Sequence, residues 1–123
     1  MRVLGIVAAL KSEVRTLTRV PIGADGLVWL DGTTLVKVAG IGAKGVLAAS
    51  ESLIAEGAAA LLSWGSGGAL HPKLSPGSLV LPKSVIASQK TVFPTDADWH
   101  NRLVARLKNR LDIHSEPVAQ SPS

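Results

Sequence analysis

Short apolar runs alternate with segments of helical periodicity along nearly the whole chain, and this alternation constrains the fold more than any other feature of the sequence. The runs are rich in branched residues and too short for core helices, which is typical of buried β-strands. They cover residues 2–8, 33–39, 58–64 and 78–81, with residues 84–88 as an extension or a further strand. Helical spacing covers residues 12–19, 43–56 and 96–111. This order predicts an α/β fold with helices on the faces of a central sheet.

An early hairpin interrupts the order of strands and helices. The turn dipeptides Asp25-Gly26 and Asp31-Gly32 flank the apolar residues 27–30, and the strand at 33–39 follows directly. We therefore expect a mixed sheet, partly parallel and partly antiparallel.

Two of the expected helices carry an apolar residue on nearly every turn of one face. These residues are Val46, Leu47, Leu53 and Ile54 in the first helix and Trp99, Leu103, Leu107 and Leu111 in the second. Thr95 and Asp96 are typical of a helix start, and Gly57 is typical of a helix end. Beyond Asp112 the sequence is interpreted as running into a polar tail.

Composition narrows the chemistry that the chain can perform. Of its 123 residues, 46% are hydrophobic and 18% are charged, which predicts one compact domain and not a disordered chain. There is no cysteine, which excludes disulfides, thiolate metal sites and cysteine nucleophiles. His71, His100 and His114 share no metal-ligand spacing, so we expect neither a metal site nor an organic cofactor.

The net charge of +4 gives little support to a nucleic-acid partner. Basic residues gather only at Arg102, Arg106, Lys108 and Arg110, and aromatic residues make up 3% of the chain, which leaves few platforms for base stacking. No apolar segment approaches the roughly 20 residues of a membrane span. The apolar start is short and is typical of a strand, not of a secretory signal. We expect a cytoplasmic protein with no nucleic-acid or membrane partner.

The segment Gly40-Ile41-Gly42-Ala43-Lys44-Gly45 matches the G-x-G-x-x-G dinucleotide pattern between a strand and a helix. The acidic residue that binds the ribose in such proteins should end the next strand, but residues 63–65 contain no carboxylate. Val46 follows Gly45, which excludes a P-loop. The sequence favours a tight strand-to-helix turn over a dinucleotide site, and such a turn can still let a ligand lie close to the backbone.

Gly65-Ser66-Gly67-Gly68 is expected to be a loop, because three glycines in four residues disfavour both helix and strand. It follows the C-terminal end of a strand, where open α/β sheets bind ligands, and it offers N–H groups and one hydroxyl to a phosphate or a sugar. Glu13 lies just past the first strand, at the same end of the sheet. A desolvated carboxylate there can act as a general base. The alternative interpretations are that Glu13 is a capping or solvated residue and that residues 65–68 form a plain flexible turn.

Four blocks follow one another in the sequence: residues 5–14 (GIVAALKSEV), 40–42 (GIG), 65–70 (GSGGAL) and 76–80 (PGSLV). Their order and spacing resemble the 5′-methylthioadenosine/S-adenosylhomocysteine nucleosidase branch of the nucleoside phosphorylase superfamily. The resemblance covers essentially the whole chain but only the N-terminal half of that family. It implies a three-layer phosphorylase/hydrolase-like α/β fold with a mixed central sheet. Residues 1–123 would form the N-terminal part of a single domain that is incomplete at its C-terminus.

The resemblance also implies roles for individual residues. Glu13 matches the glutamate that activates the attacking water in the nucleosidases. The substrate-binding positions that match are Ala9 and Leu10 in the ribose and anion region, Ile41 beside the 5′ substituent, and Ser66, Gly67 and Gly68 at the ribose, nucleophile and base. In phosphorylase relatives phosphate replaces the water, so phosphate is a potential co-substrate.

Some positions depart from the nucleosidase pattern. Trp64 stands where a small polar residue is usual, Leu10 replaces a common methionine, and Ser12 replaces an acidic residue. Together with residues 94–99 (PTDADW), these departures resemble the hopanoid-biosynthesis-associated phosphorylase subgroup. The second half of the family supplies a Met-Glu pair that holds the ribose hydroxyls and an aspartate that protonates the purine. Neither has a counterpart in residues 1–123.

The resemblance implies that the complete protein cleaves the N-glycosidic bond of a purine (thio)nucleoside, a small-molecule partner. Without the ribose clamp and the acid, this chain alone is expected to be inactive. Its uncovered strand edge and helix faces are expected to pair with another copy in a homo-oligomer. Two alternatives stay open: a non-catalytic truncated or oligomerising module, and a phosphorylase acting in hopanoid biosynthesis.

Overall fold

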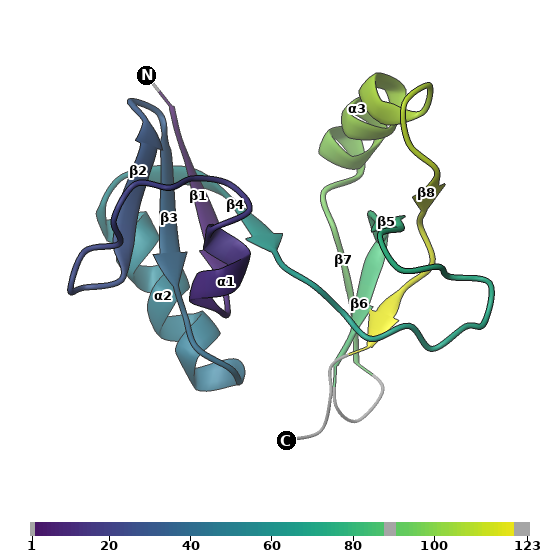
Figure 1. Cartoon of the computed structure of the whole chain (residues 1–123), viewed down its shortest axis with the longest axis horizontal. Helices are drawn as coiled ribbons and strands as arrows, with labels where there is room; N and C mark the ends of the chain where they lie inside the picture. The colour runs from purple at the N-terminus through teal and green to yellow at the C-terminus, as the bar shows by residue number, and fades with distance from the viewer. Residues whose placement is uncertain (1, 88–90, 120–123) are drawn as a thin grey trace. The chain divides into compact units, whose positions relative to one another are not determined.

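The computed structural model of the chain describes residues 2–87 and 91–119. The chain divides into two compact units, Met1–Gly67 and Gly68–Ser123, and each unit has its own β-structure (Figure 1). No helix within the described ranges is both long and apolar enough to cross a membrane.

The first unit is built on a four-stranded mixed sheet in the order β2-β3-β1-β4. β1 (Val3–Ala8) pairs in parallel with β3 (Thr34–Val38) on one side and with β4 (Ala58–Trp64) on the other. β2 (Leu27–Asp31) pairs antiparallel with β3. The predicted hairpin and the predicted mixed sheet are both confirmed.

Helices cover both faces of this sheet. Successive residues of a strand point to opposite sides, so each strand contributes apolar side chains to a core on either face. Ile6 of β1 belongs to the core that α1 (Lys11–Val14) closes with its buried Val14. The next residue, Val7, belongs to the opposite core, which α2 (Ala43–Ala55) closes. The first unit therefore contains helix, sheet and helix in three layers (Figure 1).

The apolar face predicted for α2 is only partly buried. Leu53 is fully buried, but Val46, Leu47 and Ile54 are exposed. Ala49, one turn before Leu53, packs against the sheet in their place. Residues four apart lie one above the other on a helix, so Ala49 and Leu53 form the buried stripe, and the larger apolar residues flank it.

The prediction that residues 58–64 form a buried strand is half wrong. The strand exists with those bounds, but within residues 2–87 and 91–119 β4 pairs with β1 alone and lies at the edge of the sheet. Most of its side chains are exposed, although nearly all of them are apolar. An apolar composition predicts a strand, but it does not specify the position of that strand in the sheet.

The second unit carries short strands. β5 (Leu79–Val80) pairs in parallel with β8 (Ile113–His114), and β6 (Ser84–Ile86) pairs antiparallel with β7 (Val92–Pro94) and in parallel with β9 (Val118–Ala119). β5 is shorter than predicted and is not fully buried. The sequence did not predict the last three strands, because runs of two or three residues show no periodicity. Position 88, in the predicted strand at 84–88, lies outside the described residues.

The helix of the second unit, α3 (Ala97–Leu107), begins as predicted. The side chain of Asp96 accepts a hydrogen bond from the N–H of Trp99 at 2.8 Å and caps the first turn. The buried residue of α3 is His100, which the apolar pattern did not include. Its Nε2 lies 2.9 Å from the carbonyl oxygen of Leu81, and it donates there because a carbonyl can only accept. The predicted core residues Trp99, Leu103 and Leu107 are half-buried, and Leu111 is exposed beyond the helix end.

Candidate active site

The candidate site lies at the C-terminal ends of β1 and β4. α1 begins three residues after β1 and carries Glu13 in its first turn, and Ser66 follows β4 after one residue. Because β1 and β4 are parallel neighbours, their C-terminal ends meet at the same edge of the sheet. The structure thus brings Glu13 and Ser66 together, as their positions after the two strands predict.

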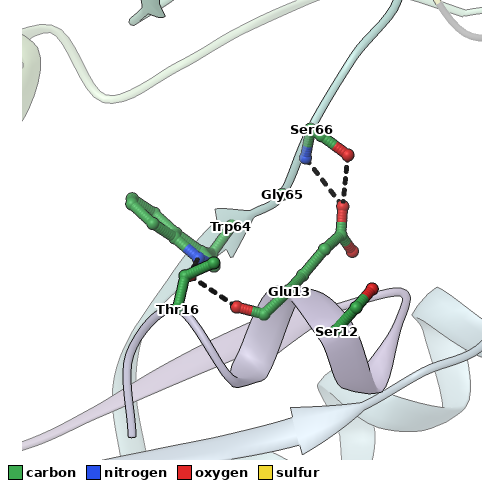
Figure 2. Close-up of a pocket in the computed structure, with 6 residues that line it drawn as sticks. All are labelled: Ser12, Glu13, Thr16, Trp64, Gly65 and Ser66. Carbon is green, nitrogen blue, oxygen red and sulfur yellow. Dashed lines mark hydrogen bonds between the residues drawn. The ribbon is translucent and has the colours of Figure 1, made fainter. Parts of the chain in front are cut away.

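The carboxylate of Glu13 accepts three hydrogen bonds. Oε2 accepts from the backbone N–H of Ser66 at 2.7 Å and from the hydroxyl of Ser66 at 3.1 Å (Figure 2). Oε1 accepts from the N–H of Leu10 at 3.0 Å. A carboxylate has about four acceptor positions, two on each oxygen. Both acceptor positions of Oε2 are therefore filled, and these three bonds leave one position on Oε1 unused.

These donors also set the ionisation of the site. The backbone N–H of Ser66 lowers the pKa of Glu13 below that of an ordinary glutamate, and the N–H of Leu10 and the hydroxyl of Ser66 act in the same direction. Partial burial opposes them by penalising the charged form. At neutral pH Glu13 is therefore an anion, able to accept a hydrogen bond and to stabilise nearby positive charge.

Gly65 makes this arrangement sterically feasible. A Cβ atom at this position would lie 2.5 Å from Oε2 of Glu13 and 2.9 Å from its carboxyl carbon. Any larger residue would therefore displace the carboxylate from Ser66. The first glycine of the loop is required by close approach to Glu13 and not by its own backbone angles.

A hollow of about 250 Å³ opens beside the carboxylate. Its lining residues are Ser12, Glu13, Thr16, Trp64, Gly65 and Ser66 (Figure 2). Complete small-molecule pockets are commonly about 300 to 1,000 Å³, so this hollow is slightly smaller than a complete pocket. Sequence reasoning assigned no role here to Thr16 or to Trp64. The sequence signal that could have identified Trp64 is an aromatic residue placed between an apolar strand and a glycine-rich loop.

The other predicted site residues do not line the hollow. Ala9 and Leu10 form the backbone that leads into α1, and the carbonyl of Ala9 accepts from the N–H of Gly40 at 3.0 Å. Ile41 is next to that contact, with 79% of its side chain exposed. The remaining two positions, Gly67 and Gly68, end the first unit and begin the second.

The Gly40–Gly45 segment has a structural explanation. Gly40 and Gly42 have φ angles of 76° and 108°, which other residues rarely adopt. A Cβ at Gly45 would lie 2.2 Å from the carbonyl oxygen of Ala39. All three glycines are needed to turn β3 into α2, as the strand-to-helix interpretation predicts. In the part of the chain that the structure describes, no three acidic or histidine side chains gather as a metal site would require.

Comparison with known proteins agrees with this architecture. No curated protein matches the chain. A mutant of Helicobacter pylori MTAN with 5′-methylthioadenosine in its active site is similar in fold, with a TM-score of 0.75 and 14% identity over 98% of this chain and 64% of that chain. The Neisseria meningitidis 5′-methylthioadenosine/S-adenosylhomocysteine nucleosidase in complex with methylthio-immucillin-A has a TM-score of 0.78 and 16% identity over 100% of this chain and 66% of that chain.

The chain spans just under two thirds of the length of these two solved structures. At such low identity they establish the fold alone. The family follows from a separate match, in which the model of the phosphorylase superfamily covers residues 26–120. This match extends over most of the sequence, and the chain therefore belongs to the phosphorylase superfamily.

Proposed function

We propose that the complete protein cleaves the N-glycosidic bond of a purine (thio)nucleoside and that Glu13 activates the attacking water. The observation that carries this proposal is the carboxylate of Glu13, which is held against Ser66, lines the hollow and keeps one acceptor position on Oε1. The two similar structures hold 5′-methylthioadenosine or methylthio-immucillin-A, which supports a thionucleoside as the ligand class.

The chemistry follows from the position of that free acceptor. A water bound to Oε1 of Glu13 can attack the anomeric carbon of the sugar as the bond to the base breaks. The carboxylate takes the proton that the water loses, and its negative charge favours the positive charge that develops on the sugar. The leaving base takes the electron pair of the broken bond and is protonated by an acid, which the resemblance places in the family's second half.

Ser66 serves this reaction by holding the general base, Glu13, in place. Two of the three hydrogen bonds to Glu13 come from this one residue. The carboxylate therefore cannot rotate towards bulk solvent without breaking both of them. We further propose that phosphate can replace water as the co-substrate, that the protein works as a homo-oligomer without a metal, and that it acts in the reducing cytoplasm, which a chain without cysteine suits.

The test is an assay of base release by the full-length protein. Methylthioadenosine and adenosine are each incubated with the protein, with and without inorganic phosphate, and adenine and the sugar product are separated chromatographically. The proposal predicts adenine and free sugar in the absence of phosphate. Turnover that requires phosphate and yields a sugar 1-phosphate would make the protein a phosphorylase. No release of base from either nucleoside under both conditions would favour a non-catalytic module.

A further inference from the structure

Trp64 presents an aromatic surface that is fixed and yet accessible. It is the last residue of β4, and its indole lines the same hollow as Glu13 and Ser66. About 37% of the side chain is exposed. Figure 2 shows the indole beside Thr16, while the carboxylate of Glu13 turns towards Ser66. The hollow therefore combines an aromatic surface with a charged group.

Thr16 holds the indole in place. Nε1–H of Trp64 donates to Oγ1 of Thr16 at 2.9 Å, and the hydroxyl of Thr16 donates to the backbone oxygen of Glu13 at 2.6 Å. Because the hydroxyl proton is engaged by that carbonyl, a lone pair of Oγ1 is left for the indole. The orientation of the ring is thus tied to the same helix that carries the carboxylate.

The surface that remains exposed is apolar ring, because the single polar group of the indole is already bonded to Thr16. Tryptophan faces bind nucleobases by stacking, and this contact tolerates different bases because every base has a flat face. A ring that is already ordered loses little further side-chain entropy when a ligand binds. The hollow has a volume of about 250 Å³, close to the lower end of small-molecule pockets, and a purine base is smaller than the ligands of such pockets.

We propose that Trp64 is a stacking subsite for the purine base of the substrate and that Thr16 is its positioning residue. The inference rests on the proposed function, because the base is bonded to the sugar carbon that Glu13 serves. It deepens that function by assigning recognition of the base to a residue of the first unit. The ligand class is a flat aromatic base, and the sugar makes no stacking contact with Trp64.

Fluorescence tests the contact directly. Residues 1–123 contain three tryptophans, so Trp29→Phe and Trp99→Phe leave Trp64 as the only one among them, and the difference from a triple variant that also carries Trp64→Phe isolates its emission. The full-length double variant is titrated with adenine and, separately, with ribose at the same concentrations. Adenine should quench the emission of Trp64 saturably, and ribose should leave it unchanged.

Calorimetry in the native background provides the matched comparison. Trp64→Leu should raise the Kd for adenine about 5- to 160-fold, the range expected for the loss of one base–aromatic stack. Trp64→Phe keeps a flat ring and should lose less than Trp64→Leu. Thr16→Val keeps the shape of the side chain but removes the hydrogen bond, and it should weaken adenine binding and shift the emission maximum of Trp64. Far-UV circular dichroism establishes that each variant is folded.

The outcomes separate this inference from the function on which it rests. If Trp64→Leu binds adenine as tightly as the wild type, or if ribose quenches Trp64 and adenine does not, the stacking subsite is refuted while the glycosidic reaction stands. If the wild-type protein binds neither adenine nor methylthioadenosine at millimolar concentration, the proposed function fails and the subsite fails with it.

Discussion

The carboxylate oxygen Oε2 of Glu13 lies 2.7 Å from the backbone nitrogen of Ser66, although 53 positions separate the two residues in the sequence. The contact exists because β1 and β4 are parallel neighbours, which places α1 and the glycine-rich loop at one edge of the sheet. It joins Glu13, the candidate general base, to the loop that follows β4. Changes in either element should therefore alter the candidate site, and the predictions below use this dependence.

Gly65→Ala should impair the reaction more than the fold. The added Cβ would lie 2.5 Å from Oε2 of Glu13, and the end of that flexible side chain can move away more easily than backbone can. We expect kcat to fall at least about tenfold, because the carboxylate is the group that moves, while the free energy of unfolding changes by about 1 kcal/mol, a typical value for one lost hydrogen bond. Steady-state kinetics and denaturant unfolding measure the two effects.

Gly32→Ala is the matched control for this prediction. Gly32 lies in the turn between β2 and β3, and a Cβ there meets nothing within 4 Å. It should change neither kcat nor stability appreciably. Equal losses of activity in the two variants would contradict a specific role for Gly65.

The pH profile should reflect the lowered pKa of Glu13. The group must be ionised to accept a proton, so activity is present above its pKa and is lost as the pH falls through it. Because the N–H of Ser66 lowers this pKa, the acidic limb of kcat/KM should lie below the usual range for glutamate. Ser66→Ala removes the hydroxyl but keeps the N–H, which is the larger cause, so the limb should move up only slightly. A wild-type limb above the usual range for glutamate would contradict the hydrogen bonds that Glu13 accepts from Ser66 and Leu10.

The Gly40–Gly45 turn should not bind NAD. Gly40 and Gly42 have positive φ angles, and Gly45 leaves no room for a Cβ beside Ala39, so the turn itself accounts for all three glycines. Calorimetric titration with NAD should show no saturable heat at micromolar affinity, with methylthioadenosine as the positive control. Saturable NAD binding would point instead to an oxidoreductase-type dinucleotide site.

The protein should self-associate, and α2 offers a surface on which to test this prediction. Val46, Leu47 and Ile54 leave an apolar strip exposed on this helix within the first unit. Symmetric pairing is the common way to cover such a strip. Light scattering should give a multiple of the chain mass, and Leu47→Lys should shift it towards the monomer. Ala48→Lys introduces the same charge at an exposed position of α2 outside this strip and is the control. A monodisperse wild-type monomer at millimolar concentration would contradict the prediction.

Sequence patterns predicted those parts of the molecule that depend on local spacing. The bounds of α2, the hairpin and the cap at Asp96 follow from periodicity, turn dipeptides and helix-start preferences, and the structure reproduces them. The contact between Glu13 and Ser66 was also predictable, because both residues follow strands of one sheet. These features need only the order of elements along the chain.

The remaining features depend on tertiary packing. The bond between Trp64 and Thr16 depends on the direction of two side chains at the ends of two elements. The burial of His100 depends on the carbonyl of Leu81 and the hydroxyl of Ser115, which lie just after β5 and β8 and 19 and 15 positions from His100. The short strands of the second unit exist only through their pairing partners. No residue pattern within a window of ten positions contains this information.

The most direct test of the account is the effect of Glu13→Gln on adenine release from methylthioadenosine by the full-length protein. Glutamine keeps the size and the acceptor oxygen of the side chain but cannot take a proton, so we predict a loss of about 100- to 10,000-fold in kcat, the range of a general base. Glu51→Gln makes the same chemical change on the exposed face of α2 and should leave the rate unchanged. A Glu13→Gln enzyme that keeps its rate to within about threefold, while folded, would contradict the account, because the carboxylate would then serve only to hold the loop.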